Sequence, residues 1–318
     1  MHKKEEHMFE FMKRPKRMRF ATLAELWLED INGKVKESTR ANYQTLLRKH
    51  LLPTFGPLYV RDLTTEQLAE FFSSMEENGL SPSTRRSIQL VLQMILRYGA
   101  ATGNCDIMLF PALPTMPRGT VGTLTDEECY KLECWIEQNM TPCNLGILLC
   151  MYTGMRIGEI CALRWSDINL RTGTVTIGRT LQRVTDRSGD GSHLMIASPK
   201  SRSGSRCIPV PRQILRELKR WAREPTDYLL TGTSEPMEPR KMQRKFKRCL
   251  ELAEVRPVKF HTLRHTFATR CMATDLDPKT LSYILGHANV STTMTVYVHP
   301  SLEQIRRCLD RLPEQKLA

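Results

Sequence analysis

The sequence predicts a mostly α-helical chain with a small β-sheet, an α+β fold, that is divided into two domains. Its 318 residues exceed the length of one average domain, so two domains are the natural division. Helix-start signals and apolar residues at helical spacing fill residues 21–103, whereas after residue 124 the helical pattern alternates with short strand-like runs bounded by turn residues. The first domain is therefore expected to be helical and the second to be mixed α/β.

Helix starts in the first region are marked by residues that can cap a helix. Thr22 with Glu25, and Thr64 with Gln67, have the spacing of capping boxes, and Ser81 precedes a proline at the first helical position. Apolar stripes follow these starts and are expected to form the core. They are Tyr43, Leu46, Leu47 and Leu51; Leu68, Phe71, Phe72 and Met75; and Ile88, Val91, Leu92 and Ile95.

The ends of the first domain are indicated by composition. The first 20 residues are rich in Lys and Arg and are expected to form a basic N-terminal arm. Residues 104–123 contain three prolines and two glycines with few charges, which is typical of an interdomain linker. The predicted organisation is an arm (1–20), a helical domain (21–103), a linker (104–123) and a second domain (124–318) that ends in a tail helix.

The second domain should begin with a helix, because Thr125 and Glu128 again have the spacing of a capping box. Helices are expected at about 125–139, 142–153 and 156–163, with further helices after residue 210. Strands are expected around 174–177, 193–197 and 207–210, with turns at 171–173 and 188–191. Cys129 and Cys161 lie on apolar helical stripes, so each is expected to be a small core residue.

The net charge points to a polyanionic partner. Lys and Arg number 47 against 34 Asp and Glu, which gives a net charge of +13. No run approaches the ~20 apolar residues that span a bilayer, and no secretory leader is evident, so a soluble intracellular protein is expected. The ten cysteines are scattered without a Cys-x-x-Cys pair, which argues against a disulfide framework.

Arginine, histidine and tyrosine residues in the second domain suggest phosphate chemistry. Arg156 and Arg264 could clamp one phosphodiester, because the guanidinium fork matches phosphate oxygens and keeps its charge. His261 precedes Arg264 by three residues, and His287 precedes Tyr297 by ten. Tyr297 would be the nucleophile.

Three sequence blocks carry a family resemblance. TGMRIGEICALRW (153–165), HTLRHTFATR (261–270) and LGHANVSTTMTVYVH (285–299) resemble the blocks of the tyrosine recombinase (phage integrase) family in order and spacing. The resemblance covers roughly residues 20 to 300. It implies a helical core-binding, SAM-like domain followed by the mixed α/β catalytic domain of that family. One departure is Cys105 after Asn104, where the family usually has Asn-Pro.

The resemblance implies roles for individual residues. Arg156 and Arg264 would contact the nonbridging phosphate oxygens, and His261 and His287 would accept a proton from the tyrosine and donate a hydrogen bond to a phosphate oxygen. Tyr297 would attack the scissile phosphate, and its spacing from His287 favours it over Tyr283, which is expected to pack in a helix. Glu159, at i+3 from Arg156, would hold that guanidinium or a histidine, or would form a purely structural ion pair.

Lys200 matches the hairpin lysine of the family. It is the sole lysine between Lys131 and Lys219, in a stretch otherwise supplied with arginine. A lysine crowded by cations can lower its pKa enough to donate a proton to a departing oxygen, whereas an arginine effectively cannot. Lys200 is therefore the candidate general acid.

The expected partners follow from the same reading. Double-stranded DNA at specific sites is the expected substrate, and Arg40, Arg48, Arg85, Arg86 and Arg202 are candidate DNA contacts. The resemblance implies a homotetramer on DNA, with a directionality factor and a host DNA-bending protein as candidate partners, in the bacterial cytoplasm at the nucleoid. No cofactor and no metal are expected, since arginines take the place of a metal ion. A zinc site at His261 and His265 is disfavoured, because no cysteine pair completes a tetrahedral set.

Several functions remain open from the sequence. Integration and excision of a mobile element is favoured by the arginine-rich stretch 179–206 and by the ending VSTTMTVYVHP (290–300). Xer-like chromosome dimer resolution is the alternative within recombinases. A type IB topoisomerase would share the chemistry but relax supercoils without pairing sites, and a catalytically silent DNA-binding regulator would lack site residues. Leu302, Ile305, Leu309 and Leu312 form a C-terminal stripe that packs either on its own chain or on a neighbouring subunit.

Overall fold

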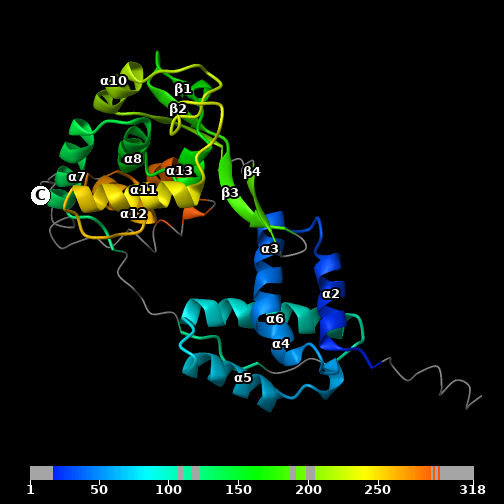
Figure 1. Cartoon of the computed structure of the whole chain (residues 1–318). Helices are drawn as coiled ribbons and strands as arrows, with labels where there is room; N and C mark the ends of the chain where they lie inside the picture. The colour runs from blue at the N-terminus through cyan, green and yellow to red at the C-terminus, as the bar shows by residue number, and fades with distance from the viewer. Residues whose placement is uncertain are drawn as a thin grey trace, which may run out of the picture. The chain divides into compact units, whose positions relative to one another are not determined.

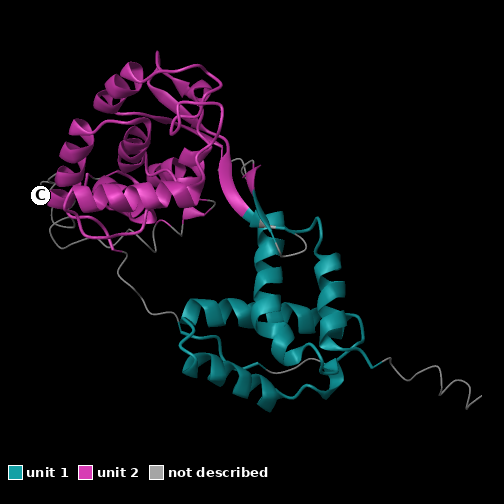
Figure 2. Cartoon of the chain, in the orientation of Figure 1, with its two compact units in different colours: residues 1–119, 184–193 teal, residues 120–183, 194–318 magenta. Residues whose placement is uncertain are grey.

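The computed structural model describes residues 17–106, 110–115, 122–186, 191–197, 205–274, 276–287, 289–290 and 293. The chain divides into two compact units, residues 1–119 with 184–193, and residues 120–183 with 194–318 (Figure 2). Each unit has its own hydrophobic core. Helices dominate both units and the sheets are small, which confirms the predicted fold class (Figure 1).

The first unit consists of short helices around an aromatic centre. The rings of Phe20 and Phe55 pack at a tilt with centroids 5.8 Å apart, and those of Phe55 and Phe71 pack edge to face at 4.6 Å. The three predicted stripes are confirmed as core, with Tyr43, Leu46 and Phe72 only partly buried at its edge. The elements are α2 (Phe20–Asp30), α3 (Glu37–Leu46), a π-helical turn (Leu47–Leu51), α4 (Leu52–Phe55), a 3-10 turn (Val60–Asp62), α5 (Thr65–Glu77) and α6 (Pro82–Ala101).

Two of the three helix starts predicted from capping signals in this unit are confirmed. Thr64 forms the predicted capping box with Gln67, and Ser81 accepts a hydrogen bond from the backbone of Thr84. The predicted start at Thr22 is wrong, because α2 begins at Phe20. Phe20 is fully buried against Phe55, so tertiary packing extends the helix past the local cap. Phe20 therefore belongs to α2 and not to the expected arm.

The beginning of the predicted linker packs on this unit. Cys105 is buried in its core, and Phe110 packs against the same core. Gln89 Nε2 donates a hydrogen bond to the Pro111 carbonyl at 2.6 Å, and Arg61 donates to the Gly103 carbonyl at 3.1 Å. Residues 107–109 and 116–121 lie outside the described part of the chain.

The second unit is built around α8 (Pro142–Thr153), which is apolar on nearly every side. It packs against α7 (Asp126–Gln138), α10 (Arg212–Arg220), α11 (Pro239–Leu252) and α12 (His261–Ala273) (Figure 1). Thr125 caps α7 by the predicted capping box, and Cys129 and Cys161 are buried as predicted. The remaining helical elements are α9 (Ile157–Cys161), a 3-10 turn (Trp165–Asp167) and α13 (Pro278–Leu285).

The strands form two small sheets. β1 (Ile168–Asn169), β2 (Thr174–Ile177) and β5 (Arg206–Pro209) make an antiparallel three-stranded sheet, and β3 (Thr180–Thr185) pairs with β4 (Ser192–Ala197). The predicted strands correspond to β2, β4 and β5, whereas β1 is too short and β3 too polar to be recognised from the sequence. Gly173, at φ +67°, makes the predicted turn before β2. Within the described ranges, the chain contains no helix long and apolar enough to span a membrane.

Candidate active site

The turn between α8 and α9 places Arg156. Gly154 ends α8 at φ +63°, and a Cβ there would approach Phe267 Cδ1 to 2.5 Å, so both the backbone and the space require glycine. Arg156 then occupies the N-cap position of α9, with extended backbone. The predicted helix 156–163 therefore starts one residue later and is shorter, because Arg156 serves as its cap.

Glu159 is the carboxylate that organises this turn. Glu159 is 8% exposed, and its two carboxylate oxygens accept four hydrogen bonds. Oε2 accepts from the Arg156 backbone nitrogen at 2.9 Å, and Oε1 accepts from Arg156 Nη1 at 2.9 Å. Arg206 Nη1 and Nη2 approach the same oxygens to 3.1 and 2.9 Å. Glu159 therefore binds two guanidinium groups together.

Burial alone would raise the pKa of the Glu159 carboxyl. Hydrogen bonds and charge from Arg206, and then those from Arg156, outweigh that effect and leave the pKa below its ordinary value. The carboxylate is thus ionised at neutral pH, as the pairing with two arginines requires.

The C-terminal end of α13 receives three guanidinium groups. The last carbonyls of a helix lack intrahelical donors and carry the negative end of its dipole, so cations are favoured there. Gly286 closes the helix at φ +66° and leads directly into His287. The hydrogen bonds run from Arg206 Nε to Ile284 O (2.6 Å), from Arg264 Nη2 to Leu285 O (2.7 Å), and from Arg156 Nη1 and Nη2 to Leu285 O (3.2 Å) and Gly286 O (3.3 Å).

The two predicted phosphate-clamping arginines differ in depth. Arg264 is 2% exposed, and its Nη1 donates to the Gly154 carbonyl at 2.9 Å. The Arg156 side chain is 39% exposed. Of these two arginines, Arg156 is therefore the one that meets solvent, whereas Arg264 is buried.

The two predicted histidines belong to the same cluster. His261 is the first residue of α12, and His287 follows the end of α13, where its Nδ1 lies 2.8 Å from Thr293 Oγ1. Burial lowers the pKa of His287 to about 4, and the charges of Arg264 and Arg156 act in the same direction. Desolvation, followed by the same two arginines, also lowers the pKa of His261. Both imidazoles are thus neutral at pH 7, and each can accept a proton or donate one hydrogen bond.

The depressed histidine pKa values predict a loss of stability in mild acid. The unfolded chain protonates a histidine near pH 6.5, whereas folded His287 and His265 protonate near pH 4. The unfolded state holds more protons between these values, so the free energy of unfolding should fall as the pH drops from about 6.5 to about 4. We expect Tm to decline over this window in the wild type and to decline less in His287→Gln. His50→Gln, in the other unit, is the control, and equal pH profiles for wild type and His287→Gln would contradict the assignment.

Three predicted site residues, Lys200, Arg202 and Tyr297, lie outside the described residues, and their roles remain predictions. The C-terminal stripe from Leu302 to Leu312 lies outside them as well. Tyr283, expected to pack, is 56% exposed, so that prediction is wrong. Its neighbours Leu281 and Leu285 take the buried face of α13.

The predicted DNA-contacting arginines of the first unit have unequal surroundings. Arg48 is exposed. Arg85 has a side chain only 12% exposed and pairs with Glu76 at 2.6 Å. Arg40 Nε lies 3.5 Å from the Leu28 carbonyl, and Arg86 is partly buried. Arg48 is thus the most accessible of the four.

Arg206 also belongs to this cluster, although the sequence shows it only as part of the arginine-rich stretch 179–206. Its side chain is fully buried. The alternation within β5 carried the signal, because Arg206 lies on the same strand face as buried Ile208. A charged residue on the inward face of a strand needs a partner, and Glu159 is that partner.

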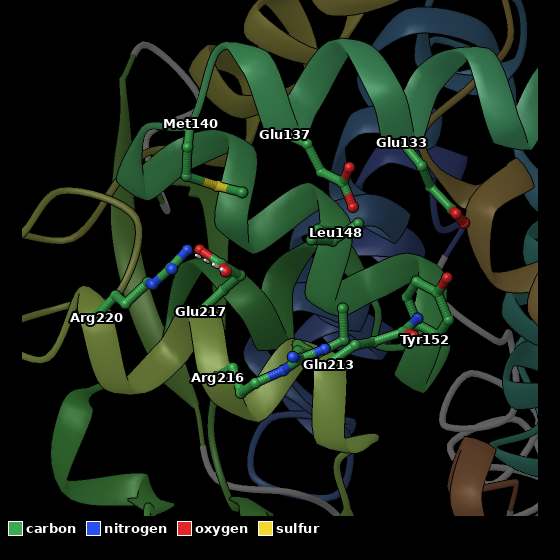
Figure 3. Close-up of a pocket in the computed structure, with 10 residues that line it drawn as sticks. Glu133, Glu137, Met140, Leu148, Tyr152, Gln213, Arg216, Glu217 and Arg220 are labelled. Carbon is green, nitrogen blue, oxygen red and sulfur yellow. Dashed lines mark hydrogen bonds and ion pairs between the residues drawn. The ribbon is translucent and has the colours of Figure 1, made fainter.

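A separate pocket of about 460 Å³ lies among α7, α8 and α10 (Figure 3). None of the described site residues lines it. Burial, followed by the charge of Glu133, raises the pKa of Tyr152 in this pocket to about 12. The lining residues are Glu133, Glu137, Met140, Leu148, Tyr152, Gln213, Ile214, Arg216, Glu217 and Arg220. Within the described part of the chain, no three His, Cys, Asp or Glu residues are grouped so that they could hold a metal ion.

Comparison with protein families and curated proteins gives consistent matches. The family described as "Phage integrase family" matches residues 123–304, and "Phage integrase, N-terminal SAM-like domain" matches residues 19–76. Tyrosine recombinase XerA of Pyrococcus furiosus is 29% identical over 299 residues, which cover 92% of each chain. The ICEBs1 integrase of Bacillus subtilis is 22% identical over 93% of this chain and 83% of its own.

Solved structures share the fold over nearly the whole chain. The Tn1549 transposon integrase in complex with a circular intermediate DNA superposes with a TM-score of 0.74 at 21% identity, covering 92% of this chain and 99% of that one. A lambda integrase tetramer bound to a Holliday junction gives a TM-score of 0.65 at 17% identity, over 93% and 82% of the two chains. At these identities the likeness establishes a common fold.

Proposed function

The chain belongs to the phage integrase family, and from that premise we propose that it is a site-specific tyrosine recombinase that integrates and excises a mobile element. It cuts and rejoins duplex DNA through a 3′-phosphotyrosine intermediate. The observation that carries the proposal is the convergence of Arg156, Arg264, His261 and His287 from separate segments of the chain. This is a cationic site with neutral imidazoles beside it, which suits a phosphodiester.

The scissile phosphate binds against the exposed guanidinium of Arg156. Arg264 lies behind it and adds charge without being displaced, because two backbone carbonyls hold its guanidinium. Charge that develops on the nonbridging oxygens is stabilised by these preoriented groups. His261 and His287 are neutral, so one can take the nucleophile's proton while the other donates a hydrogen bond to a phosphate oxygen.

Strand transfer then proceeds in two steps. The Tyr297 hydroxyl loses its proton to a histidine and attacks phosphorus, and the bond to the 5′ oxygen breaks as Lys200 protonates that oxygen. A 5′-hydroxyl from the partner strand next gives its proton to Lys200 and attacks the 3′-phosphotyrosyl link, and the histidine returns its proton to the Tyr297 oxygen as the link breaks. Because the phosphoester energy is kept in the link, the cycle consumes no ATP, and its charge stabilisation comes from arginines.

The DNA partner and the assembly follow from this reaction. Exchange of both strands of two duplexes needs four nucleophiles, so four copies act together on DNA. The helical first unit serves as the core-DNA-binding domain, and the N-terminal basic residues add phosphate contacts. The protein works at the bacterial nucleoid, where a directionality factor and a DNA-bending protein are candidate partners.

Mobile-element recombination is preferred to chromosome dimer resolution. The arginine-rich stretch 179–206 supports this preference. Relatives named for mobile elements support it as well. One of them is the transposase from transposon Tn916 of Enterococcus faecalis, which is 26% identical over 89% of this chain and 75% of its own. The likeness to XerA favours the second candidate, dimer resolution. Direct repeats at the borders of an element that contains the gene are expected, and their absence would favour the Xer-like function.

A nicked suicide substrate tests the enzyme class. With its cognate site, the wild-type protein is expected to form a covalent protein–DNA adduct in EDTA without ATP, because no step needs a metal ion. When two duplexes that each carry the cognate site are incubated with the protein, DNA products in which their strands are exchanged should appear. Failure to form any adduct would refute the proposal, and relaxation of any supercoiled plasmid by a monomer would assign the chain to type IB topoisomerases instead.

A further inference from the structure

We propose that Arg206 is a positioning residue for strand transfer, which holds Arg156 through Glu159 and fixes the end of α13 that carries His287. The inference rests on the proposed function and extends it to a residue outside the set that contacts the phosphate. Arg206 itself cannot touch a substrate, because its side chain is fully buried.

The hydrogen bonds of Arg206 connect two parts of the site. Nη1 and Nη2 reach the two oxygens of Glu159 at 3.1 and 2.9 Å, and Nε reaches the Ile284 carbonyl at 2.6 Å. Glu159 in turn binds both the backbone and the guanidinium of Arg156. A single planar fork therefore ties the α9 turn to the end of α13.

The Arg206 guanidinium packs tightly against Gly286. A Cβ on Gly286 would approach Arg206 Nη1 to 2.7 Å and Cζ to 3.0 Å. The guanidinium thus lies directly against the backbone that precedes His287. Any movement of the Arg206 side chain would be transmitted to that backbone and to the direction of the imidazole.

Charge also explains why Glu159 needs a second arginine. Arg206 occupies the buried side of the carboxylate, and Arg156 meets it from the side that is open to solvent. Without Arg206, a buried carboxylate would depend on Arg156 alone, and Arg156 would be drawn toward it and away from a phosphate. Strand β5 holds Arg206 in place, since Arg206 pairs in register with Ile177 of β2.

Arg206→Met and Arg206→Lys test the proposal on two suicide substrates. One substrate has a normal scissile phosphate, and the other has a methylphosphonate, in which a methyl group replaces one nonbridging oxygen and removes the negative charge. If Arg206 acts by placing Arg156 against that charge, Arg206→Met should form the adduct about 10²-fold more slowly on the phosphate, as for loss of one preorganised donor. Its defect should shrink to within about tenfold on the methylphosphonate, where that placement matters less. Arg206→Lys should show a smaller defect of the same kind, because lysine keeps the charge but cannot make the fork.

Arg164→Met is the matched control, because Arg164 contacts Tyr228 in the same unit. Among the described residues, its side chain makes no hydrogen bond or ion pair with Arg156, Glu159, Arg206 or Arg264. It should cleave both substrates at the wild-type rate. Wild-type cleavage of the phosphate substrate tests the proposed cleavage chemistry independently of Arg206. If the wild type cleaves, the inference is overturned when the Arg206 variants cleave like the control or when their defects are equal on both substrates. It is also overturned if neither variant folds, because the role of Arg206 would then be purely structural.

Discussion

Tyr297→Phe is expected to abolish the covalent protein–DNA adduct while leaving folding and site binding intact. The substitution removes only a hydroxyl, and no other group of the proposed mechanism can form the 3′-phosphotyrosyl link. Peptide mapping of the wild-type adduct should place the link at residue 297. The measurement is the yield of adduct on a nicked suicide substrate, together with site affinity from binding titrations.

Tyr283→Phe is the control, and it is a demanding one. Tyr283 is 56% exposed on α13, so its hydroxyl is accessible and burial does not exclude it as a nucleophile. Its variant should still form the adduct at the wild-type rate. A Tyr297→Phe protein that remains covalently active, or a link mapped to residue 283, would remove the basis of the mechanism.

Lys200→Ala is expected to slow cleavage of ordinary DNA by about 10²–10⁴-fold, the usual contribution of general acid catalysis. The departing 5′ oxygen needs a proton, whereas sulfur in the same bridging position leaves as a stable thiolate. Cleavage by Lys200→Ala should therefore return close to the wild-type rate on a substrate with a 5′-bridging sulfur. Adduct formation on the two substrates gives both rates.

Lys219→Ala provides the comparison for Lys200. Lys219 is an exposed lysine near the end of α10, so its removal changes the net charge by the same amount. It should behave like the wild type on both substrates. Equal defects of Lys200→Ala on oxygen and sulfur would assign Lys200 to DNA binding and leave the general acid unidentified.

Local features of the fold could be predicted because their causes lie within a few residues. The capping boxes at Thr64 and Thr125 place a hydroxyl and a side-chain oxygen three residues apart, and both form as expected. The apolar stripes of α5 and α6 become core, and β2 has the predicted bounds. Where a distant contact dominates, local signals fail, as at Phe20, whose burial starts α2 ahead of the Thr22 cap.

The sequence by itself determined the family, the two-part α+β architecture and the identities of the candidate site residues other than Arg206, because these depend on residue types, order and spacing. Tertiary structure alone decided how the site is held. It buries Arg264, leaves Arg156 at the surface, and places Arg206 under Glu159 across 47 residues of sequence. It also sets the histidine pKa values, since desolvation and neighbouring charge arise only when α9, α12, α13 and β5 pack together. Sequence spacing can identify a guanidinium or an imidazole as a candidate site group. The burial and the hydrogen-bond partners of that group depend on the packing of segments that are far apart in the chain.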